Sequence, residues 1–162
     1  MKNIWITGSI NSGKSTVAKI LGVKLKMAAV ELDAFSEFVE AWMPFEDYIK
    51  LNYDLVSDIV SAYNRRSVGV IVVYPLSEKV FADKKEILSD FDIFIIDPGF
   101  ENALNQRGSR VLNEWEIERI KHQYETGLHQ LSAGVKIDTS NLTPEETSET
   151  IIKNIVGIEQ LT

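Results

Sequence analysis

The chain has 162 residues, of which 44% are apolar and 25% are charged, and its 17 basic against 24 acidic side chains give a formal net charge of −7. This composition is typical of one globular domain and disfavours intrinsic disorder. The negative charge opposes nucleic-acid binding, and the absence of cysteine excludes disulfides, thiolate catalysis and cysteine-ligated metals. No apolar run approaches the roughly 18 residues of a membrane span, so we expect a cytoplasmic protein without a membrane partner.

Five short apolar runs, each bounded by turn-forming residues, predict five buried strands. They cover residues 3–7, 28–32, 68–74, 91–96 and 135–137. Between them lie stretches with helical spacing. The clearest has apolar side chains in steps of 3, 4, 4 and 3, at Ile117, Ile120, Tyr124, Leu128 and Leu131. This alternation predicts an α/β fold with a parallel sheet covered by helices, and ligands beyond the carboxyl ends of its strands.

The sequence contains no linker or internal repeat, so we expect a single domain over residues 1–162. Its last helix has a clear start, because Thr143 can act as the cap, Pro144 suits the first turn, and Glu146 completes a Thr-x-x-Glu capping box. Charge is uneven along the chain. Residues 1–30 carry five lysines and no acid, whereas residues 31–58 carry eight acids and one lysine.

The segment from Gly8 to Ser15 is the most informative part of the sequence. It reads Gly-Ser-Ile-Asn-Ser-Gly-Lys-Ser and matches the Walker A pattern G-x-x-x-x-G-K-[ST] directly after an apolar strand. In such a loop the glycines let successive N–H groups turn toward phosphates, the lysine reaches the β and γ oxygens, and the final serine binds Mg²⁺. We assign nucleotide binding to Gly8, Ser12, Gly13, Lys14, Ser15 and Thr16. The chain lacks Asn-Lys-x-Asp, by which GTPases of this class read guanine, and this absence favours ATP.

Two acids end apolar strands and compete for a catalytic role. Asp97 precedes Pro98, which fits a helix N-cap followed by proline at the first helical position, so we interpret Asp97 as structural. Asp33 has no comparable structural explanation. At the end of the second strand it could accept the proton of a substrate hydroxyl or hold a water molecule on Mg²⁺.

Arginines follow the fourth strand. Arg107 and Arg110 flank Gly108 within an acid-free run over residues 103–113, and such a segment could close as a lid over phosphates. Arg119 projects from a different face than Ile117 and could reach the nucleotide or the acceptor. The alternative for all three arginines is solvated surface charge or, for Arg119, pairing within its helix.

Together these residues resemble the P-loop small-molecule kinases, the group of shikimate, gluconate and adenylylsulfate kinases and chloramphenicol phosphotransferase. The resemblance spans nearly the whole chain. It rests on the loop at 8–15, Asp33, the segment 70–77, the segment 106–110 and the segment 138–146.

The resemblance implies a three-layer P-loop NTPase fold with a five-stranded parallel sheet and with ATP and Mg²⁺ as donor. It implies a lid at about 104–113 in which Arg107 packs on adenine and Arg110 approaches the phosphates. The loop from Thr139 to Pro144 would flank the adenine, and helices across about 34–65 would bind the acceptor. We therefore predict Lys14, Asp33 and Arg110 as catalytic residues and Ser15 and Asp33 as the Mg²⁺ site.

The acceptor is less clear from the sequence. Tyr74-Pro75-Leu76 stands where shikimate kinases have a Gly-Gly-Gly turn, which argues against shikimate, and lysines stand where gluconate kinases usually carry arginines. The presumed acceptor region combines acidic and aromatic residues: Glu37, Glu40, Trp42, Phe45, Glu46, Asp47, Tyr48 and Tyr53. This pattern predicts a neutral or cationic acceptor, such as a nucleoside, an amino sugar or an antibiotic. The alternative is that the acids coat solvated helix faces while the aromatic residues form core.

The sequence thus predicts an ATP-dependent phosphotransferase that moves the γ-phosphoryl group to a hydroxyl of a small molecule. A nucleoside or nucleotide kinase is a second interpretation. A non-catalytic ATP-binding sensor or regulatory domain is a third, because no acceptor motif is unmistakable. We expect a monomer or a homodimer.

Overall fold

The computed structural model describes residues 2–105 and 111–159. Its centre is a five-stranded, all-parallel sheet with the strand order β2-β3-β1-β4-β5. The strands are β1 (Asn3–Thr7), β2 (Ala28–Glu31), β3 (Val70–Val73), β4 (Phe91–Asp97) and β5 (Val135–Asp138). All five predicted strands are present, and with them the predicted fold class, but the edge strands β2 and β5 are only partly buried, because each has a neighbouring strand on one side alone.

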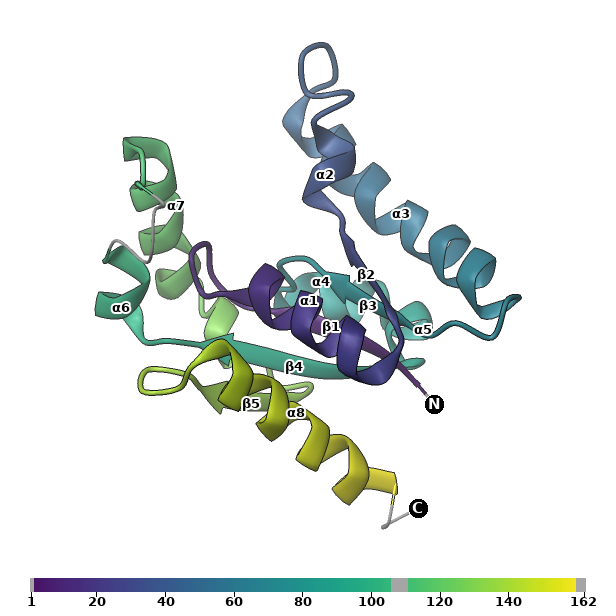
Figure 1. Cartoon of the computed structure of the whole chain (residues 1–162). Helices are drawn as coiled ribbons and strands as arrows, with labels where there is room; N and C mark the ends of the chain where they lie inside the picture. Colours follow the sequence, from purple (N-terminus) through teal and green to yellow (C-terminus); the bar gives the residue numbers. More distant parts are fainter. Residues whose placement is uncertain (1, 106–110, 160–162) are drawn as a thin grey trace.

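Helices cover both faces of this sheet, which gives three layers (Figure 1). On one face, α1 (Lys14–Leu25) and α8 (Pro144–Glu159) pack against the central strands. On the other face lie α3 (Phe45–Asn64), α4 (Glu78–Asp83) and α5 (Lys85–Leu88). The remaining elements are α2 (Asp33–Ser36), α6 (Phe100–Leu104), α7 (Glu114–Glu125) and the 3₁₀ turn η1 (Leu128–Gln130).

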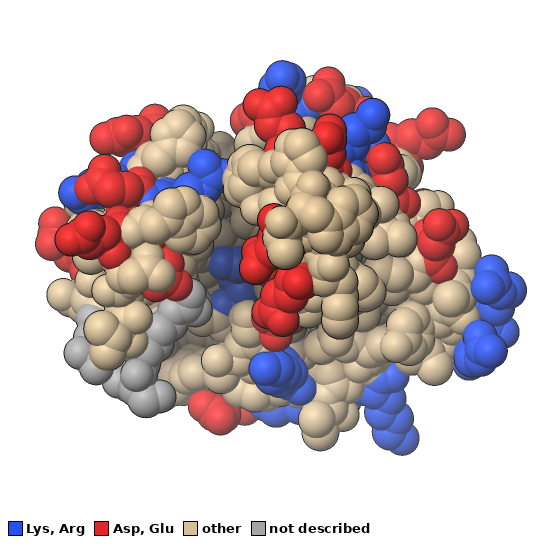
Figure 2. Space-filling model, turned by 90° about the horizontal axis from the view of Figure 1, so that it is seen from above, with Lys and Arg blue, Asp and Glu red and all other residues tan. Residues whose placement is uncertain are grey.

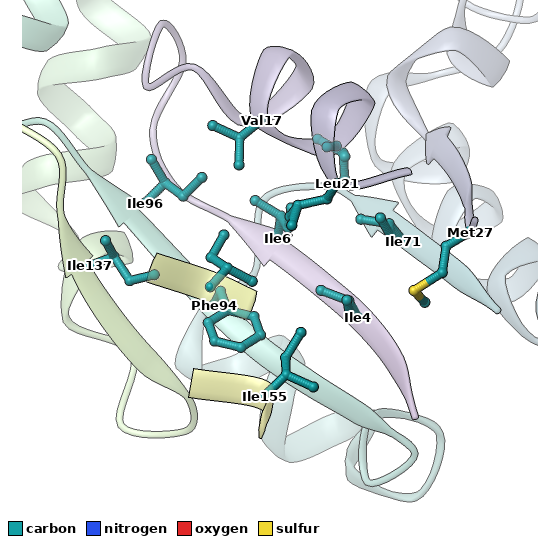
Figure 3. Packing of buried hydrophobic residues seen from close by; sticks show 13 residues of the cluster. Ile4, Ile6, Val17, Leu21, Met27, Ile71, Phe94, Ile96, Ile137 and Ile155 are labelled. Carbon is teal, nitrogen blue, oxygen red and sulfur yellow. The ribbon is translucent and has the colours of Figure 1, made fainter. Parts of the chain in front are cut away.

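The central strands are apolar on both faces because both faces are buried. Alternate side chains of β1 divide between the layers: Ile4 and Ile6 face α1 and α8, whereas Trp5 faces α3 and α5. Val17 and Leu21, one turn apart on α1, meet the first set (Figure 3). Each fully buried side chain of this size contributes about 1.5–3 kcal/mol. The sheet is therefore a rigid base for the loops at its carboxyl edge.

The helix predicted from the apolar spacing over 117–131 is shorter than that spacing indicates. Helix α7 ends at Glu125, and Gly127 follows with a φ of 73°, a left-handed conformation that ends helices and favours glycine. Leu128 and Leu131 remain buried, but a 3₁₀ turn and a loop bring them there. The prediction of one continuous helix is therefore wrong, and of its predicted buried side chains Ile120, Leu128 and Leu131 are buried whereas Ile117 and Tyr124 are partly exposed.

The start of α8 is confirmed. The amide of Thr143 donates to Glu146 Oε2 at 2.9 Å, and the amide of Glu146 donates to Thr143 Oγ1 at 3.2 Å, which completes the capping box. Within residues 2–105 and 111–159, no helix combines the length and the apolar character needed to cross a membrane.

Candidate active site

The phosphate-binding loop joins β1 to α1 at the carboxyl edge of the sheet. Its first glycine, Gly8, has a φ of 149°, and a Cβ there would collide with the carbonyl oxygen of Ile96 on β4. The loop closes on itself through a hydrogen bond from the Ser12 amide to the Ser9 carbonyl, and Gly13 is the N-cap of α1. The chain thus has the tight, glycine-dependent turn that precedes a helix N-terminus in phosphate-binding loops.

Lys14 lies back over this loop. Its Nζ atom is 2.5 Å from the Ser9 carbonyl oxygen and 3.5 Å from Ser12 Oγ. The ammonium group therefore adds its positive charge to that of the loop amides and the helix N-terminus, and all three favour binding of an anion.

Ser15 donates its hydroxyl hydrogen to Glu31 Oε2 at 2.8 Å. Glu31 is the last residue of β2, and its other carboxylate oxygen pairs with Lys19 Nζ at 3.5 Å. Sequence reasoning missed Glu31. The available signal was a second acid two residues before Asp33 at the end of a strand.

Asp33 begins α2 directly beyond β2 and lines a cavity at the carboxyl edge of the sheet. Its carboxylate remains open to solvent through that cavity, yet enough protein surrounds it that desolvation raises its pKa above the ordinary value. The charge of Lys14 opposes this shift and the charge of Glu31 adds to it. The predicted base, the phosphate-loop lysine and the second carboxylate are therefore neighbours.

The cavity has a volume of about 520 Å³ and lies between α2–α3 on one side and α7 on the other. Figure 2 shows this hollow from above, between two raised lobes, with basic atoms at its base and acidic atoms along the α2–α3 side. A cavity of this size suits a small organic molecule. Four of its carboxylates belong to Asp33, Glu37, Glu40 and Glu116.

A buried polar network supports the cavity wall. Asn52 on α3 donates from Nδ2 to Ser36 Oγ at 2.7 Å and to the Tyr74 hydroxyl at 3.1 Å. Tyr53 donates its own hydroxyl hydrogen to the Pro75 carbonyl at 2.6 Å. Burial raises the pKa of Tyr74 to about 12, so this phenol stays neutral at physiological pH. The network ties α2 and α3 to the end of β3, and sequence reasoning did not identify it.

Arg119 lines the same cavity from α7, with its guanidinium carbon 5.8 Å from the ring centroid of Phe45. Ile120, the next residue of α7, is fully buried, because consecutive side chains of a helix point about 100° apart. The prediction that Arg119 projects away from the core is confirmed.

Asp97, the other strand-end acid, has a structural environment. Its carboxylate accepts hydrogen bonds from the Gly99 amide at 2.9 Å and the Tyr124 hydroxyl at 2.8 Å, and it pairs with Lys136 Nζ at 2.8 Å. Burial works against the charge, but Lys136, Tyr124 and Gly99 outweigh it and lower the pKa of Asp97. The expected N-cap role is wrong, because α6 begins at Phe100 with Gly99 as its N-cap.

The predicted adenine-side residues lie beyond β5. Thr139 is buried and donates its amide hydrogen to the Asp97 carbonyl at 2.8 Å, while Pro144 begins α8. Among the residues that the structure describes, the Thr139 hydroxyl has no hydrogen-bond partner. Arg107 and Arg110 of the predicted lid lie within 106–110, outside the described residues.

Two curated relatives align over almost the whole chain. The shikimate kinase of Sulfurihydrogenibium sp. (strain YO3AOP1) is 27% identical, with 96% of this chain and 98% of the relative covered. The shikimate kinase of Thermodesulfovibrio yellowstonii is 29% identical, with 94% of each covered. The crystal structure of shikimate kinase from Aquifex aeolicus superposes with a TM-score of 0.69 at 19% identity and covers 97% of this chain and 98% of that one. No family model matches the chain.

The resemblance to the P-loop small-molecule kinases is confirmed. The three-layer fold with its five parallel strands is the fold of the Aquifex aeolicus shikimate kinase. The curated relatives support the prediction of an ATP-using kinase that transfers a phosphoryl group to a hydroxyl of a small molecule.

Proposed function

We propose that the chain transfers the γ-phosphoryl group of ATP directly to a hydroxyl of a small molecule bound in the cavity between α2–α3 and α7. One observation carries this proposal: the cavity and the phosphate-binding loop meet at Asp33, which lines the cavity and senses the charge of Lys14. In-line phosphoryl transfer requires the attacking hydroxyl oxygen and the leaving oxygen of ATP to lie on opposite sides of the γ-phosphorus. The acceptor site and the nucleotide site must therefore meet, as they do at Asp33.

The nucleotide would lie on the loop and the N-terminus of α1. Backbone amides from Gly8 to Thr16 suit the phosphates, with Ser12 and Gly13 in the turn and Lys14 above it. The family resemblance assigns Arg107 to adenine, Arg110 to the phosphates, and the loop from Thr139 to Pro144 to the far side of the base. The Thr139 hydroxyl is buried and has no hydrogen-bond partner within residues 2–105 and 111–159, which supports a polar contact on that side.

The residues present fit Mg²⁺. Ser15 Oγ and Glu31 Oε2 lie 2.8 Å apart beside the phosphate loop, and Asp33 is close enough to Glu31 for their charges to interact. Within the described residues no group of three or more acidic, histidine or cysteine side chains could form a complete metal cage. Mg²⁺ commonly retains water molecules and uses substrate phosphates, so a sparse oxygen set is sufficient. When bound, the ion neutralises phosphate charge, and Ser15 with Glu31 or Asp33 would hold it.

Asp33 is the proposed general base. Its carboxylate accepts the hydroxyl proton of the acceptor as that oxygen approaches the γ-phosphorus. Desolvation raises its pKa and makes it a stronger base than an ordinary aspartate. Lys14 holds the phosphate oxygens during transfer, and no covalent intermediate on the protein is required.

The acceptor is proposed to be neutral or cationic. Both curated relatives are described as shikimate kinases, and shikimate carries a carboxylate. The described lining residues of this cavity include four carboxylates and one arginine. A carboxylate in this cavity would meet repulsion from most of the charged groups around it.

A phosphoryl-transfer assay with labelled ATP tests the proposal on four groups of acceptors: nucleosides, amino sugars and neutral polyols; shikimate and gluconate; nucleoside monophosphates; and water as the blank. We expect transfer to members of the first group that exceeds hydrolysis. Asp33→Asn should abolish transfer and leave ATP binding intact. Exclusive use of shikimate or gluconate would reject the acceptor class. ATP binding with no transfer in any group, unchanged by Asp33→Asn, would favour the sensor interpretation.

A further inference from the structure

The charge of the cavity wall is strongly negative. Glu37 and Glu40 follow α2 and line the cavity with Asp33, and within the described part of the chain neither glutamate side chain has a hydrogen bond or an ion pair. Glu116 lines the opposite wall, where its carboxylate also accepts the Asn113 amide hydrogen in the capping box of α7. The carboxylate oxygens of Glu37 and Glu40 can therefore accept hydrogen bonds from a ligand or pair with its positive charge.

Arg119 does not reverse this charge. Tyr48 lies in the same cavity, and its pKa is raised first by burial and then by the carboxylates of Glu40 and Asp33, while Arg119 lowers it. The net effect at Tyr48 remains a raised pKa. Burial makes the largest contribution to that shift, so the charge of the wall is better judged from its residues: the described lining holds four carboxylates and one arginine, which leaves a net negative charge.

Aromatic rings also line the cavity, among them Phe45, Tyr48, Tyr53 and Trp115, together with aliphatic and neutral polar side chains. The face of an aromatic ring attracts cations, and carboxylates beside such rings strengthen that attraction. The ring of Phe45 already makes a cation–π contact, because the guanidinium carbon of Arg119 lies over it, 5.8 Å from the ring centroid. Trp115 is 60% exposed and offers its ring to an incoming molecule.

We infer that the acceptor of this cavity is an alcohol that also carries an ammonium group and a ring, an inference that rests on the proposed function. The ammonium group lies between the aromatic wall and the carboxylates of Glu37 and Glu40, and the hydroxyl group points to Asp33. In the reaction, the acceptor oxygen bonds to the γ-phosphorus of ATP as the bond to the bridging β,γ-oxygen breaks. The hydroxyl proton passes to Asp33, and the ammonium group keeps its protons.

Three probes on nearly one skeleton test the charge preference: tyramine with an ammonium group, tyrosol with a hydroxyl group, and 4-hydroxyphenylacetate with a carboxylate. Their affinities for the whole chain are measured by isothermal titration calorimetry without nucleotide. We expect the order tyramine, tyrosol, 4-hydroxyphenylacetate, with at least about a tenfold difference between the first and the last. The difference should shrink as salt is added.

A matched pair of double variants locates the effect. Glu37→Gln with Glu40→Gln removes two charges from the cavity wall and should bring the three affinities within about threefold of each other. Glu46→Gln with Asp47→Asn removes two charges from the exposed first turn of α3, outside the cavity lining, and should leave the preference unchanged.

The inference is overturned if 4-hydroxyphenylacetate binds as tightly as tyramine, if tyramine does not bind at about 10 mM, or if the cavity variant keeps the full preference. ATP binding is measured on the same samples. Intact ATP binding without a charge preference would reject this inference alone, whereas loss of ATP binding would reject the proposed kinase.

Discussion

Asp33 and Asn52 illustrate two different tasks for polar residues at the edge of one cavity. Asp33, the proposed base, is exposed in the cavity, and the protein around it makes its charged form costly. Asn52 is 1% exposed and connects Ser36 to Tyr74 inside the wall. The first residue is placed for the proposed chemistry at a cost in stability, and the second holds the wall in place.

Asp33→Asn should change stability as well as activity. Because burial raises the folded-state pKa of Asp33, the folded chain binds a proton there more tightly than the unfolded chain does. The wild type therefore loses stability as pH rises from the unfolded pKa, near 3.8, through the raised folded pKa. We expect the Asn variant to unfold at a higher temperature at neutral pH, and the advantage to shrink below pH 3.8. Thermal unfolding across pH measures this, and an advantage that grows toward acid would contradict it.

Asn52→Ala should lower the free energy of unfolding by about 1–3 kcal/mol, because it leaves the buried Tyr74 hydroxyl and Ser36 without their shared donor. Asn64→Ala, at the exposed end of the same helix, should change it by less than about 0.5 kcal/mol. Urea unfolding compares the two variants. Equal losses would show that the network carries no stability of its own.

At the scale of elements, the strands were predictable and several contacts were not. Continuous apolar runs located all five strands, including the edge strands β2 and β5, which are only partly buried. The N-cap role predicted for Asp97 was wrong because Pro98 is a local cue, whereas the partners that hold Asp97, Tyr124 and Lys136, are distant in sequence. Glu31 was missed for the same reason, since its contact with Ser15 spans 16 residues.

The capping box of α8 gives a test at this scale. Thr143→Ala removes the hydroxyl that accepts from the Glu146 amide and should cost about 1 kcal/mol of unfolding free energy. Thr143→Ser keeps the hydroxyl and should retain most of the stability. Chemical denaturation distinguishes them, and identical midpoints for the Ala and Ser variants would refute a capping contribution.

At the scale of the whole molecule, the arrangement of the sheet brings distant segments to one edge. The loop after β1, Asp33 after β2 and Tyr74 after β3 lie together because parallel strands share their carboxyl ends. The apolar runs and the Walker A motif of the sequence predicted a ligand site at this edge. The volume of the cavity and the contribution of α7 to its wall could not be predicted from the sequence. They depend on how the helices cross in the folded chain, and residue spacing does not give this.

Nucleotide binding should stabilise the whole chain. ATP with Mg²⁺ at a hundred times its dissociation constant should add about 2.7 kcal/mol to the unfolding free energy. Lys14→Ala should remove most of this gain, since the ammonium group over the phosphate loop is lost. Lys153→Ala, on the exposed face of α8, is the matched control and should keep it. An undiminished gain in the Lys14 variant would place the nucleotide elsewhere.

Trp5 is 1% exposed, stacks parallel to Tyr53 and donates from its indole to the Tyr74 carbonyl, whereas Trp42 and Trp115 are 71% and 60% exposed. One tryptophan is therefore buried in the core, and the other two are exposed to solvent. Acrylamide should quench the long-wavelength part of the emission and spare a blue-shifted remainder from Trp5. That remainder would follow melting of the core, while the quenchable part would include Trp115, which lines the cavity, and would respond to a molecule bound there.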